Sequence, residues 1–405
     1  MPDASASTVE IRTVSSRRDL RRFIDFAYDL YDEATYPNWV APLRMATSDA
    51  LDTKGNPFYL RADRELFLAL RADRVVGRIA AIENRAHNEF YADRVGFWGF
   101  FECVDDQRVA DALFAAVSGW LAARELTAMR GPMNPSTNYE CGLLVEGFEH
   151  RPSFMTAWNP PYYDALCAGA GQAKAKDLLG FWFDGETTGY ALPEFVARQA
   201  ERALAGRTLT FRDLDPSRFD EEVAALWGIY NDAWERNWGF VPMSRPEFLY
   251  MAKDMKQLLD PRFAFMAELA GEPVGFMLAL PDYNEVLKYN RSGRLLPLGG
   301  PLMLWGKRRI RDMRVMALGV RTSARSRSIL ALFTHEIMRR GSLYGKNGAE
   351  ASWLLEDNQL IVKPMRAMGA RERMRWRVYE GGCYRLALPE LGVPPASGVP
   401  ASCDR

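Results

Sequence analysis

The stretch MRVMALGVRTSARSRSIL, residues 313–330, decides the fold of the second half of this chain of 405 residues. Its first eight residues, Met313–Val320, are almost all apolar, which predicts a strand buried in the middle of a sheet. The residues that follow are small or basic and lead into an apolar-periodic run, which predicts a helix over 326–340. We therefore expect this stretch to fold as a strand, a basic turn and a helix.

The segments around this stretch follow a regular order of strands and helices. Before it, we expect a strand over 208–214, helices over 220–237 and 245–259, a hairpin over 262–280 and an insertion over 281–311. After it, we expect a strand over 349–356, a helix over 358–368 and a closing strand over 372–379. The second half is thus predicted to be an α/β unit with a mixed central sheet flanked by helices.

The first half repeats this order. It contains a strand over 9–14, a helix over 19–31, a hairpin over 65–83, a strand over 95–103 and an amphipathic helix over 106–126. We therefore predict two domains of one fold, 1–190 and 191–388, followed by a loose tail over 389–405.

The order of elements resembles the GNAT superfamily of acyl-CoA N-acyltransferases, which implies two tandem GNAT-like domains. In that superfamily the central strand enters an Arg/Gln-x-x-Gly-x-Gly/Ala turn, whose N–H groups hold the pyrophosphate of coenzyme A at a helix N-terminus. The resemblance assigns acyl-CoA to Leu318, Val320, Arg325, Ser326, Arg327, Ser328, Ile329 and Asn358. Ser326 and Ser328 replace glycine, and Met365 replaces the tyrosine that often protonates the leaving thiolate.

The first half enters its predicted helix through an acidic segment, Glu102–Asp106, that has no glycine turn. Acidic side chains repel a pyrophosphate. We therefore assign acyl-CoA to the second half and interpret the first half as the acceptor side or as a degenerate partner.

The first half also carries a dense segment of its own, GPMNPSTNYECGLLVEGF at 131–148, followed by 159–163 and 174–178. With the tandem arrangement, these stretches resemble the GNAT-like bacterial ceramide synthases. That resemblance implies acyl-CoA-dependent N-acylation of a long-chain sphingoid base, either sphinganine or its 3-oxo form.

Amide formation from a thioester needs a group that deprotonates the amine. Glu102 ends the 95–103 strand, where the superfamily usually has its base, and Glu140, His150 and Tyr163 are further catalytic candidates. The acceptor is assigned to Asn134, Asn138, Tyr139, Asn159 and Tyr162. The structural alternatives are a paired strand-end carboxylate, a turn bonded to its own backbone, a surface histidine and packed aromatic rings.

Composition limits the partners of the chain. Lys and Arg number 52 and Asp and Glu also 52, and this zero net charge argues against nucleic acid. Five cysteines without a C-x-x-C pair and three scattered histidines predict no metal site. The first residues lack the pattern of a secretory signal, so we expect a cytoplasmic protein.

The insertion suggests a further partner. Its run Leu295–Trp305 is apolar and is followed by Lys307, Arg308, Arg309, Arg311 and Arg314. This pairing favours peripheral attachment to the anionic inner-membrane surface, and a solvated basic loop is the alternative. Two rival functions stay open, a tRNA-dependent aminoacyl or peptidyl transferase of tandem-GNAT type and a non-catalytic lipid-binding protein.

Overall fold

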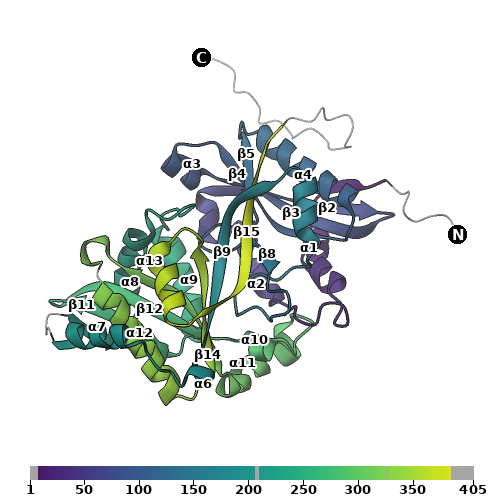
Figure 1. The fold of residues 1–405 in the computed structure, drawn as a ribbon. Helices are drawn as coiled ribbons and strands as arrows, with labels where there is room; N and C mark the ends of the chain where they lie inside the picture. Colours follow the sequence, from purple (N-terminus) through teal and green to yellow (C-terminus); the bar gives the residue numbers. More distant parts are fainter. Residues whose placement is uncertain (1–7, 206–208, 326, 385–405) are drawn as a thin grey trace, which may run out of the picture.

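The computed structural model describes residues 8–205, 209–325 and 327–384, which form two halves joined through one large sheet (Figure 1). The elements of the first half are β1 (Glu10–Thr13), α1 (Arg17–Leu30), α2 (Arg44–Ala50), β2 (Ala62–Arg71), β3 (Arg74–Asn84), α3 (Arg85–Tyr91), β4 (Val95–Cys103), α4 (Gln107–Ala122), β5 (Ala128–Gly131), β6 (Met133–Asn134), β7 (Glu140–Cys141), β8 (Leu143–Glu146), α5 (Tyr163–Gly169) and β9 (Ala173–Asp184).

The second half begins with two connecting helices and then follows the predicted order. Its elements are α6 (Gly185–Thr188), α7 (Glu194–Ala205), β10 (Leu209–Asp213), α8 (Phe219–Trp234), α9 (Arg245–Leu258), β11 (Ala264–Leu269), β12 (Glu272–Pro281), α10 (Asn284–Leu287), α11 (Gly300–Gly306), β13 (Asp312–Val320), α12 (Arg327–Leu343), β14 (Gly348–Leu355), α13 (Gln359–Ala367) and β15 (Arg371–Gly382).

The main sheet has the strand order β1-β2-β3-β4-β5-β15-β9-β14-β13-β12-β11-β10, with β8 paired to β15. The order is symmetric, because β1–β5 on one side correspond to β10–β14 on the other. The last strand of each half is exchanged: β9 pairs with β14 of the second half and β15 with β5 of the first. Figure 1 shows β9 and β15 side by side between the halves.

Local sequence explains the hairpins and the first-half helix. The β2–β3 hairpin turns through Ala72 and Asp73, and both residues have a positive φ, as a tight two-residue turn requires. Helix α4 buries Val109, Leu113 and Val117 completely, on one face at helical spacing. These observations confirm the predicted hairpin and amphipathic helix.

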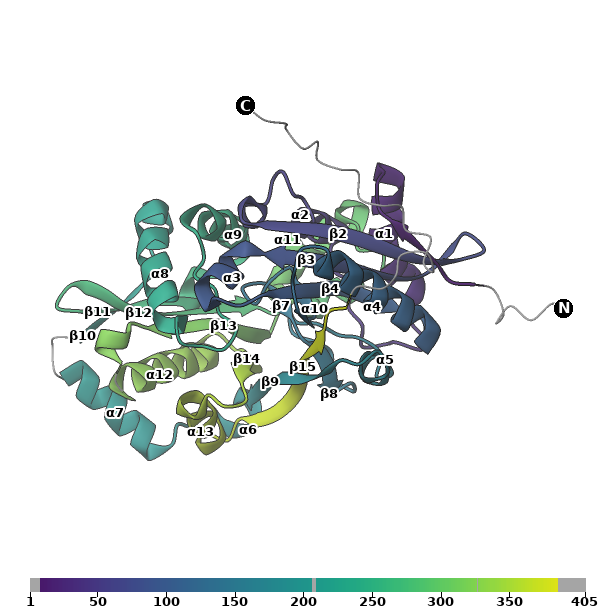
Figure 2. The same cartoon turned by 90° about the horizontal axis from the view of Figure 1, so that it is seen from above.

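Helices cover both faces of the second-half strands. Figure 2 shows α8 and α9 on one face and α12 and α13 on the other. In the first half, α1 and α4 occupy opposite faces in the same way, with Phe23 of α1 and Leu113 of α4 in two separate apolar clusters. The mixed α/β architecture predicted from the sequence is therefore confirmed.

The insertion between β12 and β13 contains α10 and α11 and exposes several large apolar side chains. Leu296, Leu304 and Trp305 are each more than 70% exposed, whereas Arg314 of the expected basic flank is only 5% exposed. Across the described residues, no helix combines the length and the apolar character needed to cross a bilayer.

Candidate active site

Strands β13 and β14 part in the middle of the second half. Their parallel ladder joins Asp312–Val315 to Gly348–Ala351 and ends there. Two cavities open beyond that point, on opposite faces of the sheet. Both are lined by Met316, Ala317, Ser352 and Trp353, so the cavities meet where the strands separate.

The α12–α13 cavity has a volume of about 160 Å³ and lies between these two helices and the parted strands. Leu318 and Asn358, two of the residues assigned to acyl-CoA, line it together with Met365. Asn358 occupies the N-cap position of α13, but within the described chain its side chain makes no capping bond. Asn358 thus lines the cavity without serving as a side-chain cap of the helix.

The remaining residues of the predicted anion-binding turn have different surroundings. The Arg325 guanidinium donates a hydrogen bond to the carbonyl of Ala233 at the end of α8. Ile329 is buried in the apolar cluster of Phe333, and Val320 packs against that cluster. Ser326 lies outside the described residues, and so do the side chains of Arg327 and Ser328, whose backbone begins α12.

The α8–α9 cavity is larger, about 270 Å³, and lies between α8, α9 and strands β12 and β13. One end contains a group of polar residues around the parting strands: Asn138, Tyr139, Glu140, Arg314 and Ser352. The first three belong to the 134–141 loop of the first half. The structure thus brings a first-half loop into the cavity of the second half.

Glu140 is the carboxylate at this junction. Its Oε1 accepts a 3.0 Å hydrogen bond from Nδ2 of Asn134, whose own Oδ1 accepts from the N–H of Phe100 at 2.6 Å. Burial raises the pKa of Glu140, while the bond from Asn134 and the charge of Arg314 oppose that rise. The result is an oriented carboxylate with an elevated pKa on the cavity wall.

The other loop residues fasten the loop to both halves, Asn138 to the second and Tyr139 to the first. Asn138 donates to the carbonyl of Val241 at 3.1 Å and accepts from the hydroxyl of Tyr230 at 2.9 Å. Tyr139 donates to Oδ1 of Asn56 at 3.3 Å. Both side chains line the cavity, but these hydrogen bonds hold the loop in place.

Arg314 was expected in an exposed basic flank, and that expectation is wrong. It belongs to β13, and its Nε donates to Oγ of Ser352 at 3.1 Å. Its NH1 donates to the carbonyls of Phe154 and Met155 at 2.7 and 2.8 Å. Arg314 therefore ties together both parted strands and a first-half segment beside Glu140.

Glu102 belongs to a different cluster, in the core of the first half. Its carboxylate accepts hydrogen bonds from Tyr31 and, at 2.7 Å, from Tyr163, and lies 3.5 Å from the Arg78 guanidinium. Burial raises the pKa of Glu102, and the nearby Arg78 opposes this. Glu102 and Tyr163 line neither of the two cavities, and the observed pairing is the structural alternative for a strand-end carboxylate.

Three further candidates lie away from the cavity junction. The amide of Asn159 bonds the N–H and the carbonyl of Leu144, so main-chain groups occupy it. The Tyr162 hydroxyl donates to the carbonyl of Cys103 at 2.8 Å. His150 is half-buried beside Glu149, and burial lowers the pKa of its ring.

The corresponding strands of the first half stay in close contact. A Cβ atom on Gly99 would lie 1.8 Å from the carbonyl oxygen of Met133, and one on Gly131 would lie 2.2 Å from that of Trp98. Only glycine permits this approach. At the start of α4, Asp106 caps the helix and pairs with Arg71 at 2.6 Å. An acidic side chain of the predicted turn therefore already binds the N-terminus of this helix.

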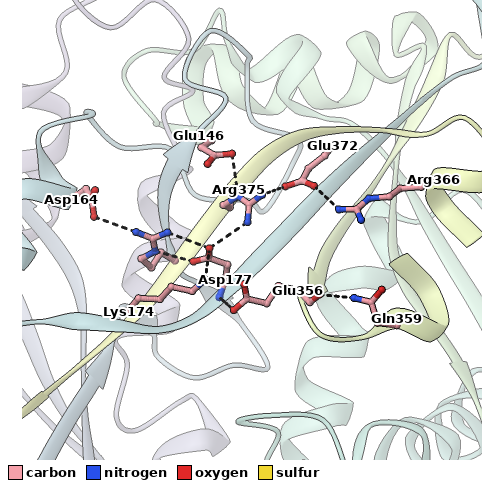
Figure 3. Close-up of polar contacts among 10 residues, drawn as sticks. Glu146, Asp164, Lys174, Asp177, Glu356, Gln359, Arg366, Glu372 and Arg375 are labelled. Carbon is pink, nitrogen blue, oxygen red and sulfur yellow. Dashed lines mark hydrogen bonds and ion pairs between the residues drawn. The ribbon is translucent and has the colours of Figure 1, made fainter. Parts of the chain in front are cut away.

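A network of charges fixes the exchanged strands next to the α12–α13 cavity (Figure 3). The buried Asp177 of β9 accepts from Lys174 and from Arg377 of β15, both at 2.8 Å. Lys174 also reaches Glu356 at 2.8 Å, directly after β14. The loop that leads to Asn358 is therefore anchored to a first-half strand.

Sequence reasoning missed the second-half residues that shape the cavities. Trp353 and Met316 stand at the junction, and Phe248, Met251 and Met255 of α9 line the α8–α9 cavity. The α9 residues do carry a signal, because they recur at helical spacing. The same spacing is typical of ordinary core packing, so it did not distinguish a cavity wall.

Similar proteins are known by sequence. The chain is 36% identical over 385 residues to a bacterial ceramide synthase of Caulobacter vibrioides, an alignment that covers 93% of this chain and 98% of that protein. It is 32% identical over 376 residues to protein YghO of Escherichia coli, with 91% and 94% covered. A scan against family profiles returns no match.

Similar solved structures share the fold at low sequence identity. A tandem GNAT protein from the clavulanic acid biosynthesis pathway superposes with a TM-score of 0.54 at 11% identity and covers 93% of this chain and 99% of that one. A GCN5-related glucosamine N-acetyltransferase region of a fungal enzyme also gives 0.54, at 13% identity, with 92% of this chain and 38% of that chain covered.

Proposed function

Because the chain belongs to the family of bacterial ceramide synthases and is an N-acyltransferase with the GNAT fold, we propose that it transfers an acyl group from acyl-CoA to an amine. The proposed acceptor is the amine of a long-chain base, sphinganine or 3-oxosphinganine. One observation carries the proposal. Two cavities, on opposite faces of the sheet, meet between the parted strands β13 and β14 beside Glu140. A transferase with two substrates needs such a meeting point.

The α12–α13 cavity is the proposed donor site. Its walls are largely apolar, Asn358 offers an amide, and the parted strand edges are suited to a narrow, amide-containing arm such as pantetheine. The N-terminus of α12, with Arg325 before it, is suited to the phosphates. Coenzyme A would supply the activated thioester. The tight contacts of Gly99 and Gly131 argue against an equivalent site between the first-half strands.

Glu140 is the proposed general base. An amine is protonated near neutral pH and must lose a proton before it attacks a carbonyl. The raised pKa of Glu140 makes its carboxylate a better proton acceptor, and Asn134 holds one of its oxygens in place. Met365 lines the donor cavity and has no proton to donate, so it does not protonate the leaving thiolate.

We further propose that the insertion between β12 and β13 attaches the protein to a membrane surface. Leu296, Leu304 and Trp305 are exposed, and Arg308 and Arg309 follow them on the surface. Exposed apolar side chains beside cations are typical of segments that bind the interface of an anionic bilayer. A two-chain lipid product would be released close to that surface.

A transfer assay tests the proposed function. Purified protein with a long-chain acyl-CoA and either base should release free thiol and form an amide of the expected mass. Glu140→Gln should abolish amide formation, whereas Glu149→Gln, on an exposed side chain nine residues farther along the chain, should not. Thiol release with small amines but with neither long-chain base would reject the proposed acceptor, and full activity of Glu140→Gln would reject the assigned base.

A further inference from the structure

Helix α9 has an apolar stripe in which, among the described residues, Phe248 is the one member that packs against a core cluster. Phe248, Met251, Ala252 and Met255 follow helical spacing and all line the α8–α9 cavity. All four are only half-buried, and the one buried residue of the helix is Glu247. A stripe of this composition that packed on a sheet would be buried. It is half-exposed because it faces the cavity.

The cavity runs along the full length of the two antiparallel helices. At the junction end, the rings of Tyr230 and Phe248 lie 5.6 Å apart. At the other end, Nζ of Lys256 lies 4.4 Å from the centre of the Phe219 ring and bridges α9 to α8. Phe219 and Trp234 both line the cavity, and the rise of the helix puts about 22 Å between them.

The polar lining is unevenly distributed. The group formed by Glu140, Arg314 and Ser352 lies at the junction, where the strands part. Along the helices the lining consists mainly of Leu, Met, Val and aromatic side chains, among them Val223, Leu226 and Met251. The charged residues farther along have partners of their own: the buried Glu222 pairs with Arg212 at 2.5 Å, Asp215 accepts from the Ser217 hydroxyl, and Lys256 lies over the Phe219 ring. A ligand with one polar end and a long hydrocarbon chain matches this distribution.

We propose that the α8–α9 cavity holds the hydrocarbon chain of the acyl donor, and that Phe219 with Lys256 limits the length of that chain. The inference rests on the proposed function and deepens it. The thioester must lie at the junction of the cavities, next to Glu140, and the chain attached to it continues directly into the α8–α9 cavity. The bridge between Phe219 and Lys256 crosses the far end of that path.

Direct binding tests this proposal without an acceptor. Titration calorimetry would measure the affinity of the intact protein for saturated acyl-CoA thioesters of increasing length. Each methylene buried in the cavity should lower Kd about fourfold. That gain should stop at a definite length, when the chain reaches the far end.

Two substitutions should move this limit in opposite directions. Ala252→Trp narrows the middle of the cavity and should shift the limit to shorter chains, while Phe219→Ala opens the far end and should shift it to longer ones. Lys253→Trp is the matched control, because Lys253 is the exposed neighbour of Ala252 and lies outside the lining. The ratio of long-chain to short-chain affinity within one sample is independent of the folded fraction.

The outcomes separate this inference from the proposed function. The inference is overturned if the acyl-chain length at which the affinity stops rising is the same in both variants as in the wild type. Amide formation should also be measured across bases of different length. If the variants change the preferred length of the base but not that of the acyl chain, the cavity holds the base and the inference is again overturned. If the limit shifts as expected but no amide forms with either base, the chain site stands and the proposed acceptor is rejected.

Discussion

Arg377 of the last strand donates from Nε to Oδ1 of Asp177 at 2.8 Å, and this bond ties the end of the chain to the strand that closes its first half. Asp177 is 1% exposed and also accepts from Lys174. Since β9 and β15 each complete the sheet of the other half, this pair lies at the point where both halves depend on each other (Figure 3).

Asp177→Asn should lower the free energy of unfolding by about 2 to 3 kcal/mol, because it leaves several cations near a buried neutral group. Burial raises the pKa of Asp177, but the bonds from Arg377 and Lys174 outweigh it and the net pKa is lowered. The stabilising contribution is therefore present above the unfolded-state pKa and lost as pH falls. Urea unfolding of both proteins at pH 7 and pH 3 measures it.

The control for this prediction is Glu146→Gln, which removes an exposed carboxylate 3.1 Å from Arg375 of the same strand. A pair with an exposed carboxylate contributes little. Equal losses from both variants, or a loss from Asp177→Asn that stays constant down to pH 3, would contradict the role of the buried bond.

Lys176→Met should weaken acyl-CoA binding several-fold with little change in stability. Its Nζ lies 2.7 Å from Asp357, the residue before Asn358 of the α12–α13 cavity. Loss of the pair frees the loop that presents Asn358, whereas a pair with an exposed carboxylate stabilises the fold by at most about 1 kcal/mol. Arg198→Met breaks a comparable exposed pair on α7 and serves as the control in calorimetry. Equal affinities for all three proteins would show that the pair does not position the loop.

Glu102→Ala should destabilise the protein without changing the rate of transfer per folded molecule. The substitution removes the carboxylate acceptor of the Tyr31 and Tyr163 hydroxyls and the charge partner of the buried Arg78, at a cost of about 2 to 4 kcal/mol. Thermal unfolding and initial rates, normalised to folded protein, check the two halves of this prediction. A stable variant that has lost turnover would return Glu102 to the role of base.

The sequence was sufficient for elements whose signals are local. The tight turn at Ala72 and Asp73, the stripe of Val109 and Leu113 on α4, and the apolar run of β13 each depend on neighbours in the chain, and all three were predicted. The overall α/β order followed from them.

Features that depend on distant contacts could not be predicted in this way. Strands β9 and β15 have the composition of ordinary closing strands, and only the folded chain decides which sheet each completes. Arg314 follows a run of exposed cations in sequence but is buried, because its donors are satisfied by Ser352 and by the carbonyls of Phe154 and Met155. Asn159 lies in a segment associated with function, but it bonds the main chain.

Glu247→Gln should remove a pH dependence of stability. Glu247 is buried, its Oε1 has no hydrogen-bond partner among the described residues, and burial raises its pKa to about 7. The folded protein therefore binds a proton more tightly than the unfolded chain, so wild-type stability is full below about pH 4.5 and falls as pH rises to 7. Relative to wild type, the variant should gain roughly 3 kcal/mol between pH 4.5 and 8. Unfolding curves that stay parallel across this range, as expected for the exposed control Glu235→Gln, would contradict the shift.

Replacement of Leu304 and Trp305 by Asp should abolish binding to anionic vesicles. Their side chains are 76% and 78% exposed, so the substitutions cost the fold little, while transfer of each apolar group from water into a bilayer is worth about 1.5 to 3 kcal/mol. Loss of both groups should thus weaken binding at least about a hundredfold. Co-sedimentation with vesicles that contain phosphatidylglycerol measures this, with pure phosphatidylcholine as reference. Leu343→Asp, on a side chain of α12 that is 63% exposed, is the matched control.

The wild-type protein should also lose binding to the vesicles as the salt concentration is raised, because salt screens the attraction between Arg308, Arg309 and the anionic surface. Vesicle binding that survives both the double substitution and high salt would show that another surface carries it.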